Sequence, residues 1–378
     1  MGKVLTVTVF AVFGGAWYMW DMVRVRLLWV LALCSIRLAG EVPAAAVESI
    51  PRVVSEAMQR RHIPAVSVAV WEGEGPVWAS AWGFADVENF TPATPATVFR
   101  IGSVSKPFTA VAALQLVEEG KLDLAAEVQR YVPSFPRKRW PVTVRELLCH
   151  QAGIRNYGAG EFDSTRHYGS LGEAIQIFAR DPLQQEPGTK YAYTTYGFNL
   201  AGAAVEGAAG VPFAEQVKKR ILEPAGAERM QPDDVYRIVP YRAHGYRTRS
   251  DGTLENCALA DTSNKLPGGG WLATAADLVE FGRAILQGKL LKPESVEAMW
   301  TPQKLASGEA TGYGLGWGLY RQEALLVAEH SGTQQGIKSH LLIVPERRLV
   351  IAVLTNLEES GAPEIGRGML AEMLRRPQ

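Results

Sequence analysis

The stretch Phe99-Arg100-Ile101-Gly102-Ser103-Val104-Ser105-Lys106-Pro107-Phe108-Thr109 decides how this 378-residue chain is interpreted. It predicts a loop that leads into a helix, with Ser103 as the N-cap and Gly120 at the C′ position after the last turn. Ser103 and Lys106 are three positions apart, which places both side chains on the same face of a helix. The lysine amine could then accept a proton from the serine hydroxyl.

The composition is that of a folded globular protein. Hydrophobic residues make up 47% of the chain and charged residues 21%, and 39 Lys plus Arg balance 39 Asp plus Glu. Because the formal net charge is zero, no global field favours nucleic acid or an acidic partner, and we expect no nucleic acid partner. A chain of this length can bury a large core and could hold one large domain or two intermingled ones.

Two short apolar runs distinguish the N-terminal residues from the rest of the chain. Residues 4–20 are largely apolar, and the segment 22–26, with two arginines, introduces a second run at 27–36. A basic segment, a short apolar run and small residues after it are typical of a secretory signal. We expect residues 1–46 to be a signal peptide or an N-terminal membrane anchor, and the protein to be periplasmic, secreted or membrane-anchored. A start of translation at Met22 is an alternative.

Strand patterns lie near both ends of the remaining chain. The predicted strands are 65–71, 77–82, 313–317, 339–344 and 349–355. The helices predicted next to these strands are 47–61, 274–286 and 363–374. Short helical patterns separated by Gly and Pro loops fill the middle of the chain, and one of these helices begins at Thr143.

This order of elements predicts an α+β fold. An antiparallel sheet with flanking helices is formed by both termini, and a mainly helical subdomain is inserted between them. The domain is expected at 47–378, with a sheet part of about 47–100 and 265–378 and a helical part of about 101–264. We expect no cofactor, because no cysteine spacing indicates zinc and the glycines at 268–270 lack the Lys-Ser/Thr of a phosphate-binding loop. Cys149 and Cys257 either pair or, as we favour, are single buried thiols.

A lone Ser-x-x-Lys pair is a weak signal, because such pairs occur by chance on many solvated helix starts. Here the serine is predicted at a helix N-terminus, where free backbone N–H groups and the helix dipole can stabilise an oxyanion. The apolar helix around Lys106 would disfavour the ammonium form and lower the pKa of the amine toward that of a usable base. Ser103 and Lys106 are therefore a candidate nucleophile and base.

Seven short segments occur in a fixed order between residues 53 and 356. They are 83–86, 99–106, 142–150, 187–191, 267–270, 313–317 and 330–332. In this order they resemble the serine β-lactamase-related family, which includes class C β-lactamases, D-alanyl-D-alanine carboxypeptidases and related esterases. The resemblance implies a β-lactamase/transpeptidase-like fold and catalysis through an acyl-enzyme.

By this resemblance Ser103 is the nucleophile, Lys106 is its partner and Tyr193 is a second catalytic acid/base. Tyr193-Thr194-Thr195 stands where the family has Tyr-x-Asn, which is similar to the serine β-lactamase-like branch. Thr195 is a substrate-binding candidate, but a threonine lacks the amide donors that contact an acylamino group in β-lactamases. His150 resembles a structural histidine of the family.

The third motif implied by the resemblance is His330-Ser331-Gly332, in place of Lys-Thr-Gly. His330 is expected to bind a substrate carboxylate. A histidine is neutral or cationic near pH 7, so its positive charge is weaker than that of lysine and can be switched by pH. Gly332 would allow close backbone approach, and the N–H groups of Thr333 and Ser103 would form an oxyanion hole.

Together these features predict an exported serine hydrolase whose partner is a small-molecule or peptide substrate. The substrate classes are small esters, D-amino-acid peptides and β-lactams. Ester turnover is expected to exceed β-lactam turnover, because Thr195 and His330 replace the residues that hold the acylamide and the carboxylate. The alternative is a non-catalytic descendant that binds peptides or acts as a scaffold. The sequence leaves the oligomeric state open.

Overall fold

The computed structural model describes residues 44–375. The signal peptide or membrane anchor predicted for residues 1–46 lies outside the described residues, apart from its last positions, which begin helix α1 (Ala44–Arg61). Within 44–375, no helix combines the length and the apolar character needed to cross a membrane.

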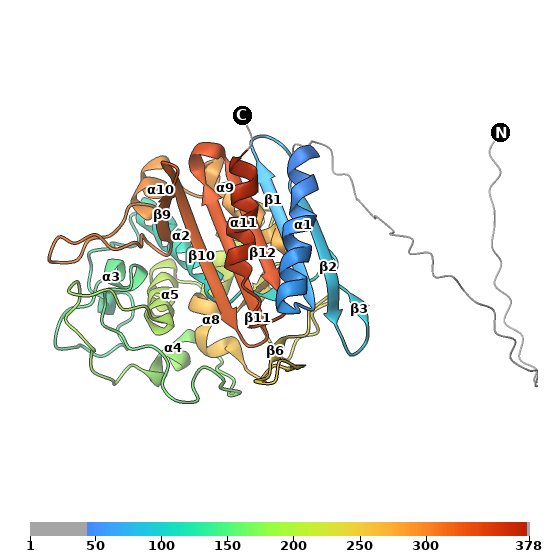
Figure 1. Ribbon diagram of the computed structural model, residues 1–378. Helices are drawn as coiled ribbons and strands as arrows, with labels where there is room; N and C mark the ends of the chain where they lie inside the picture. Colours follow the sequence, from blue (N-terminus) through green and yellow to red (C-terminus); the bar gives the residue numbers. More distant parts are fainter. Residues whose placement is uncertain (1–43, 376–378) are drawn as a thin grey trace, which may run out of the picture. The chain divides into compact units, whose positions relative to one another are not determined.

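An antiparallel sheet is the centre of the described part, in the strand order β3-β2-β1-β12-β11-β10-β9 (Figure 1). The bounds are β1 Ala65–Glu72, β2 Trp78–Asp86, β3 Thr91–Pro92, β9 Gly318–Gln322, β10 Leu325–Gln334, β11 Ile337–Val344 and β12 Leu349–Thr355. Strand β1 pairs with β12, with Val66 opposite Thr355, so the first and last strands meet in the sheet. This confirms the predicted antiparallel sheet formed by both ends of the chain.

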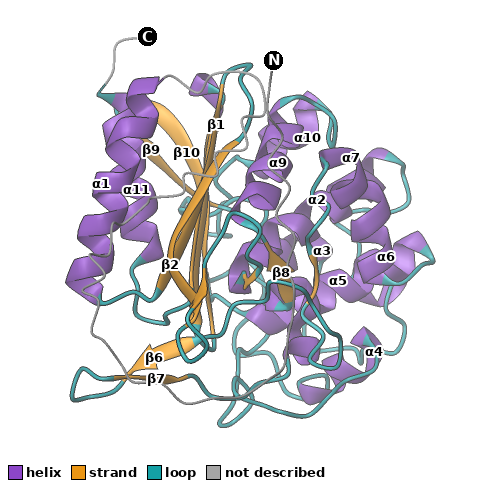
Figure 2. Ribbon diagram, turned by 90° about the vertical axis from the view of Figure 1, so that its right-hand side faces the viewer, coloured by secondary structure: helices purple, strands orange, loops and turns teal. Residues whose placement is uncertain are grey.

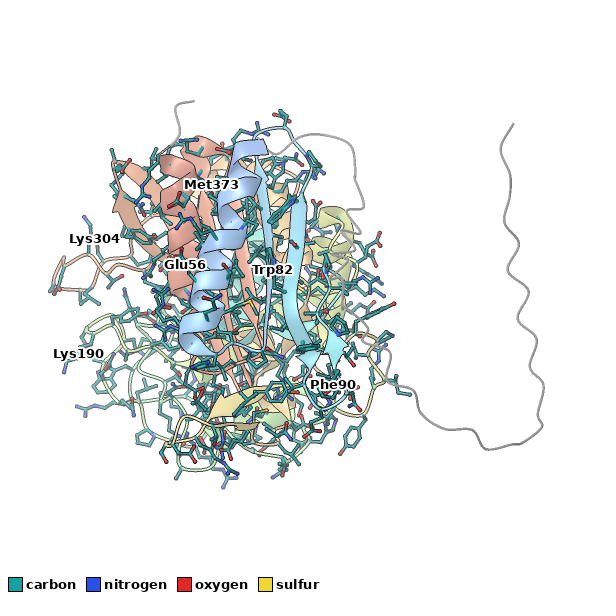
Figure 3. The ribbon with its side chains drawn as sticks, turned by 45° about the vertical axis from the view of Figure 1, so that its right-hand side comes forward. Glu56, Trp82, Phe90, Lys190, Lys304 and Met373 are labelled. Carbon is teal, nitrogen blue, oxygen red and sulfur yellow. The ribbon has the colours of Figure 1, made fainter. Side chains whose placement is uncertain are left out.

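Helices cover both faces of this sheet (Figure 2). One face is covered by α1 and by α11 (Ala362–Leu374), whose apolar residues pack on alternate residues of β1 such as Val66 and Val68. The other residues of β1, such as Ala69, face the larger core with α9 (Ala275–Leu286). In Figure 3, Glu56 marks the exposed side of α1 and Met373 the buried side of α11. Both faces are therefore apolar, as expected of a sheet between two helical layers.

The inserted part is mainly helical, as predicted. Its helices and α10, which follows α9, are α2 Ser105–Glu118, α3 Val144–Leu148, α4 Leu171–Ala174, α5 Thr195–Ala209, α6 Phe213–Val217, α7 Glu223–Ala225, α8 Leu266–Gly269 and α10 Pro293–Met299. Its short strands are β4 Phe99–Arg100, β5 Gln231–Pro232, β6 Tyr246–Thr248, β7 Leu254–Asn256 and β8 Trp271–Ala273. Capping boxes at Thr143 and Thr274 begin α3 and α9, which confirms both predicted helix starts.

One predicted strand is wrong. The segment 313–317 is irregular, and β9 begins after it at Gly318. Gly316 has a φ of +80°, and a Cβ there would lie 2.7 Å from the Cβ of Ala110 in α2. The glycines that suggested a strand therefore let the backbone turn and pass close to α2.

The two cysteines of the described region do not pair. Cys149 is buried and Cys257 is partly buried, and both are free thiols. Burial raises the pKa of the Cys149 thiol to about 12, so this side chain is an inert apolar group at neutral pH.

Candidate active site

Ser103 lies in a single 3₁₀ turn, η1 (Gly102–Val104), that continues directly into α2. The prediction that Ser103 is the N-cap is wrong, because the N-cap of α2 is Val104 and it makes no side-chain capping bond. The Ser103 hydroxyl is instead 2.8 Å from Lys106 Nζ, one turn further along. Gly120, with a φ of +68°, follows the C-cap of α2 as predicted.

Lys106 is fully buried, and its amine has only uncharged polar partners. Nζ lies 2.8 Å from Ser103 Oγ, 3.2 Å from Thr195 Oγ1 and 2.8 Å from the carbonyl oxygen of Gly268. A neutral amine satisfies this geometry when its two N–H groups point to Thr195 and Gly268. Its lone pair then faces the hydroxyl of Ser103.

The surroundings of Lys106 favour that neutral form. Burial holds the pKa of the amine well below its usual value of 10.5, and the nearby charge of Lys265 lowers it further. None of the three hydrogen-bonding partners is a carboxylate that could stabilise the ammonium. The lowered pKa that the sequence suggested therefore has a physical basis in the fold.

The ring of Tyr193 lies beside the same amine. Lys106 Nζ is 4.8 Å from the centre of the Tyr193 ring, and Ser103 lies close enough to the Tyr193 hydroxyl to affect the pKa of the phenol. The residue is 38% exposed, yet its hydroxyl end lies against Ser103, where burial raises the pKa of the phenol above its usual value. Tyr193 is thus a neutral hydroxyl within proton-transfer reach of the serine.

Helix α5 holds Thr195 against the lysine. Thr194 is its N-cap and accepts a hydrogen bond from the Gly197 N–H, which fixes the first turn. The Thr195 N–H donates to Asn156 Oδ1 at 3.1 Å, and its side chain is buried. The Thr195 hydroxyl therefore contacts Lys106 at the edge of the cleft that Thr195 helps to line, and its substrate-binding role stays a prediction.

Strand β10 packs its backbone directly on the turn that carries Ser103. A Cβ on Gly332 would lie 2.0 Å from the carbonyl oxygen of Ile101, and one on Gly102 would lie 2.9 Å from the Thr333 nitrogen. Gly102 also has a φ of +50°, in the left-handed region that favours glycine. The close approach predicted for Gly332 is present, and it brings the backbones of Thr333 and Ser103 side by side.

His330 does not supply a positive charge. Its Nδ1 lies 2.8 Å from the carbonyl oxygen of Ser331 and its Nε2 lies 2.9 Å from the Tyr313 hydroxyl. Burial and the nearby Lys106 lower the pKa of the ring to about 3. A neutral imidazole that donates from Nδ1 and accepts at Nε2 satisfies both contacts.

The cleft at Ser103 has a volume of about 360 Å³, and several of its residues were not identified from the sequence. Its lining is Ser103, Asn156, Tyr157, Phe162, Tyr193, Thr195, Lys265, Gly268, Gly269, Ser331, Thr333 and Gln334. His330 is not part of this lining. The alternation of side chains along β10 could have indicated Ser331, since it and Thr333 point to the face opposite His330. Nothing local in the sequence indicated Asn156, Tyr157 or Lys265.

His150 is a structural residue, as expected. It is buried among aromatic rings, including those of Tyr193 and Tyr313, and its Nδ1 accepts a hydrogen bond from the Thr194 N–H at 3.1 Å.

Within 44–375, no three His, Cys, Asp or Glu side chains gather as metal ligands.

Comparison with known proteins agrees with this fold. The chain is 27% identical to the serine β-lactamase-like protein LACTB, mitochondrial, from Homo sapiens, over 84% of this chain and 78% of the relative. It is 28% identical to penicillin-binding protein 4* from Bacillus subtilis, over 80% of this chain and 70% of the relative. The solved structure of the octameric penicillin-binding protein homologue from Pyrococcus abyssi superposes with a TM-score of 0.76 at 29% identity, covering 87% of this chain and 78% of that one. The model of the β-lactamase family matches residues 50–372, and the chain therefore belongs to this family of serine acyl-transfer proteins.

Proposed function

We propose that this chain is an exported serine hydrolase that works through an acyl-enzyme on Ser103. The observation that supports this most directly is the buried amine of Lys106, which lies 2.8 Å from the Ser103 hydroxyl and has no carboxylate among its hydrogen-bonding partners. A lysine kept neutral at that distance is a base for the serine.

In the proposed first step, Ser103 Oγ attacks the substrate carbonyl carbon while its proton passes to Lys106 Nζ. The carbonyl oxygen becomes an oxyanion and accepts hydrogen bonds from the N–H groups of Ser103 and Thr333. Tyr193 donates its proton to the leaving group as the bond to the carbonyl carbon breaks, and it regains a proton from Lys106. An acyl-enzyme and the free leaving group result.

In the second step, water attacks the acyl-enzyme by the reverse route. The water gives a proton to the base, its oxygen bonds to the carbonyl carbon, and Ser103 Oγ leaves and takes the proton back. The products are the free acid and the original enzyme.

For the substrate class we favour small esters, with D-amino-acid peptides next and β-lactams last. The Thr195 hydroxyl accepts a hydrogen bond from Lys106. The His330 ring is neutral, and both of its nitrogens already form hydrogen bonds within the protein. Neither residue offers the amide or the positive charge that β-lactamases place at these two positions, and the ranking rests mainly on the missing amide at Thr195. The proposed export rests on the pattern of residues 1–46, and N-terminal sequencing of the mature protein tests it.

Covalent labelling with a fluorophosphonate probe tests the proposed nucleophile. We expect wild type and a Ser55→Ala control, altered at an exposed serine of α1, to be labelled equally, and Ser103→Ala not to be labelled. Absence of labelling in wild type, or equal labelling of Ser103→Ala, would favour the non-catalytic binding protein instead.

Initial rates on a p-nitrophenyl ester, a D-Ala-D-Ala peptide and nitrocefin then test the substrate class. We expect the ester to be fastest. A nitrocefin rate well above the ester rate would reverse the ranking.

A further inference from the structure

A second buried lysine, Lys265, lines the same cleft as Ser103. Only 1% of its surface is exposed, and its Nζ lies 2.8 Å from the carbonyl oxygen of Phe162 and 3.5 Å from Gln334 Oε1. An ammonium group has three N–H donors, and the second of these contacts is at the outer limit of a hydrogen bond. Lys265 therefore has donor capacity that its protein partners leave unused.

The carboxylates around Lys265 have other partners. Arg100 forms an ion pair with Asp233 at 2.7 Å, His167 contacts Asp261 at 2.8 Å, and Gln335 donates to Asp163 at 2.5 Å. Burial of the amine and the positive charge of Arg100 lower the pKa of Lys265 to about 7, and the three carboxylates only partly offset this effect. An anion in direct contact with the amine would add the charge compensation that its two uncharged hydrogen-bond partners do not supply.

Gln334, the last residue of β10, adds a second unused donor at the same place. It is 1% exposed, lines the cleft, and its Nε2 has no hydrogen-bond partner. A buried polar group without a partner costs about 1–3 kcal/mol, so such groups are uncommon unless a ligand or water completes them. An oxygen atom that accepts from both Lys265 and Gln334 would satisfy the two groups together.

Aromatic rings form the wall beside this pair of donors. Lys265 Nζ is 4.4 Å from the centre of the Phe162 ring and 5.1 Å from that of Tyr157, and both rings line the cleft. Such rings stabilise a cation and keep water away from it, which strengthens its attraction for an anion.

We propose that Lys265 and Gln334 form an anion subsite. This subsite selects substrates that carry a carboxylate on either the acyl group or the leaving group of the scissile bond. This rests on the proposed acyl transfer at Ser103, because the subsite and the nucleophile share one cleft. It also moves the substrate-binding cation, which the sequence analysis expected at His330, to Lys265. The neutral His330 is not part of the cleft lining, and the cation for the substrate comes from Lys265.

Matched ester pairs test the subsite. The first pair is p-nitrophenyl hemiglutarate and its methyl ester, with the charge on the acyl side. The second pair is 3-carboxyphenyl butyrate and its methyl ester, with the charge on the leaving group. In wild type at pH 6, we expect kcat/KM to favour the charged member of one pair, mainly through KM. In Lys265→Met this charged-to-neutral ratio should fall by about 10-fold or more.

A control variant and a second variant of the subsite isolate this effect. Lys138 also donates to two carbonyl oxygens, those of Ala179 and Asp181, but lies outside the cleft, so Lys138→Met should leave the ratio unchanged. Gln334→Glu places a carboxylate beside Lys265 and should lower the ratio as Lys265→Met does. Thermal melts identify any variant that does not fold. An unchanged ratio in both folded subsite variants would overturn the proposal, as would a wild type that prefers neither charged ester.

Calorimetry with glutarate keeps the subsite distinguishable from the catalytic proposal. Ser103→Ala should bind glutarate at pH 6, and the double variant Ser103→Ala, Lys265→Met should bind it at least 10-fold more weakly. If no ester is hydrolysed but this difference is found, acyl transfer fails and the subsite is retained. If Ser103-dependent hydrolysis is found without the difference, the subsite fails and acyl transfer is retained.

Discussion

The contact between strand β10 and the turn that carries Ser103 predicts a large effect of one added methyl group. In Gly332→Ala, the new Cβ would lie 2.0 Å from the carbonyl oxygen of Ile101 and 2.3 Å from Ser339 Oγ, where ordinary contacts begin at 3.4 Å. The Ser339 hydroxyl itself donates to that carbonyl at 2.7 Å. The strand and the turn must therefore separate by more than 1 Å, because both close atoms belong to the buried core around the turn.

This separation moves the Thr333 N–H relative to Ser103. A misplacement of about 1 Å in a catalytic group can cost about 100-fold in rate. Overpacking of a buried site costs about 1–3 kcal/mol of unfolding free energy. We therefore expect Gly332→Ala to fold, to melt a few degrees lower and to lose about 100-fold in the rate of acylation.

The rate constant for fluorophosphonate labelling, measured together with a thermal melt, checks this prediction. Gly312→Ala is the matched control, because a Cβ there meets its nearest atom, the carbonyl oxygen of Leu319, at 3.7 Å. The reasoning is refuted if Gly332→Ala reacts within about threefold of wild type, or if Gly312→Ala loses as much.

Two further predictions concern the proton-transfer groups. Lys106 accepts a proton only when its amine is neutral, so kcat/KM on a neutral ester should rise with pH through the pKa of Lys106 and then level off. Because burial lowers that pKa, the plateau should begin well below pH 10.5. A value of kcat/KM that still rises near pH 10 would contradict this prediction. Tyr193→Phe should keep the ring beside Lys106 but lower kcat/KM by about 10²- to 10⁴-fold. The control Tyr191→Phe, on the same loop, should change kcat/KM little. Equal losses of kcat/KM in the two variants, measured in steady-state assays, would argue against Tyr193 as the acid/base.

Several features of this protein were determined locally and could be predicted from the sequence. The β-hairpin of β1 and β2, and the capping boxes at Thr143 and Thr274, depend on residues within a few positions of one another. The same holds for the approach of Ser103 to Lys106, because residues three positions apart face the same side where the 3₁₀ turn continues into α2. The order of the motifs identified the family, whose model matches 50–372.

The tertiary structure decided what the site contains and how it is charged. Thr195 and Gly268 reach Lys106 from helices far along the chain. Lys265, just before α8, and Gln334 of β10 meet in the cleft because α8 and β10 both pack on the turn at Ser103. The charge of His330 could not be predicted either, because burial and neighbouring groups decide whether a histidine ring is protonated or neutral. Sequence patterns record local spacing, whereas burial, pKa and unused hydrogen-bond donors arise when distant segments exclude water together.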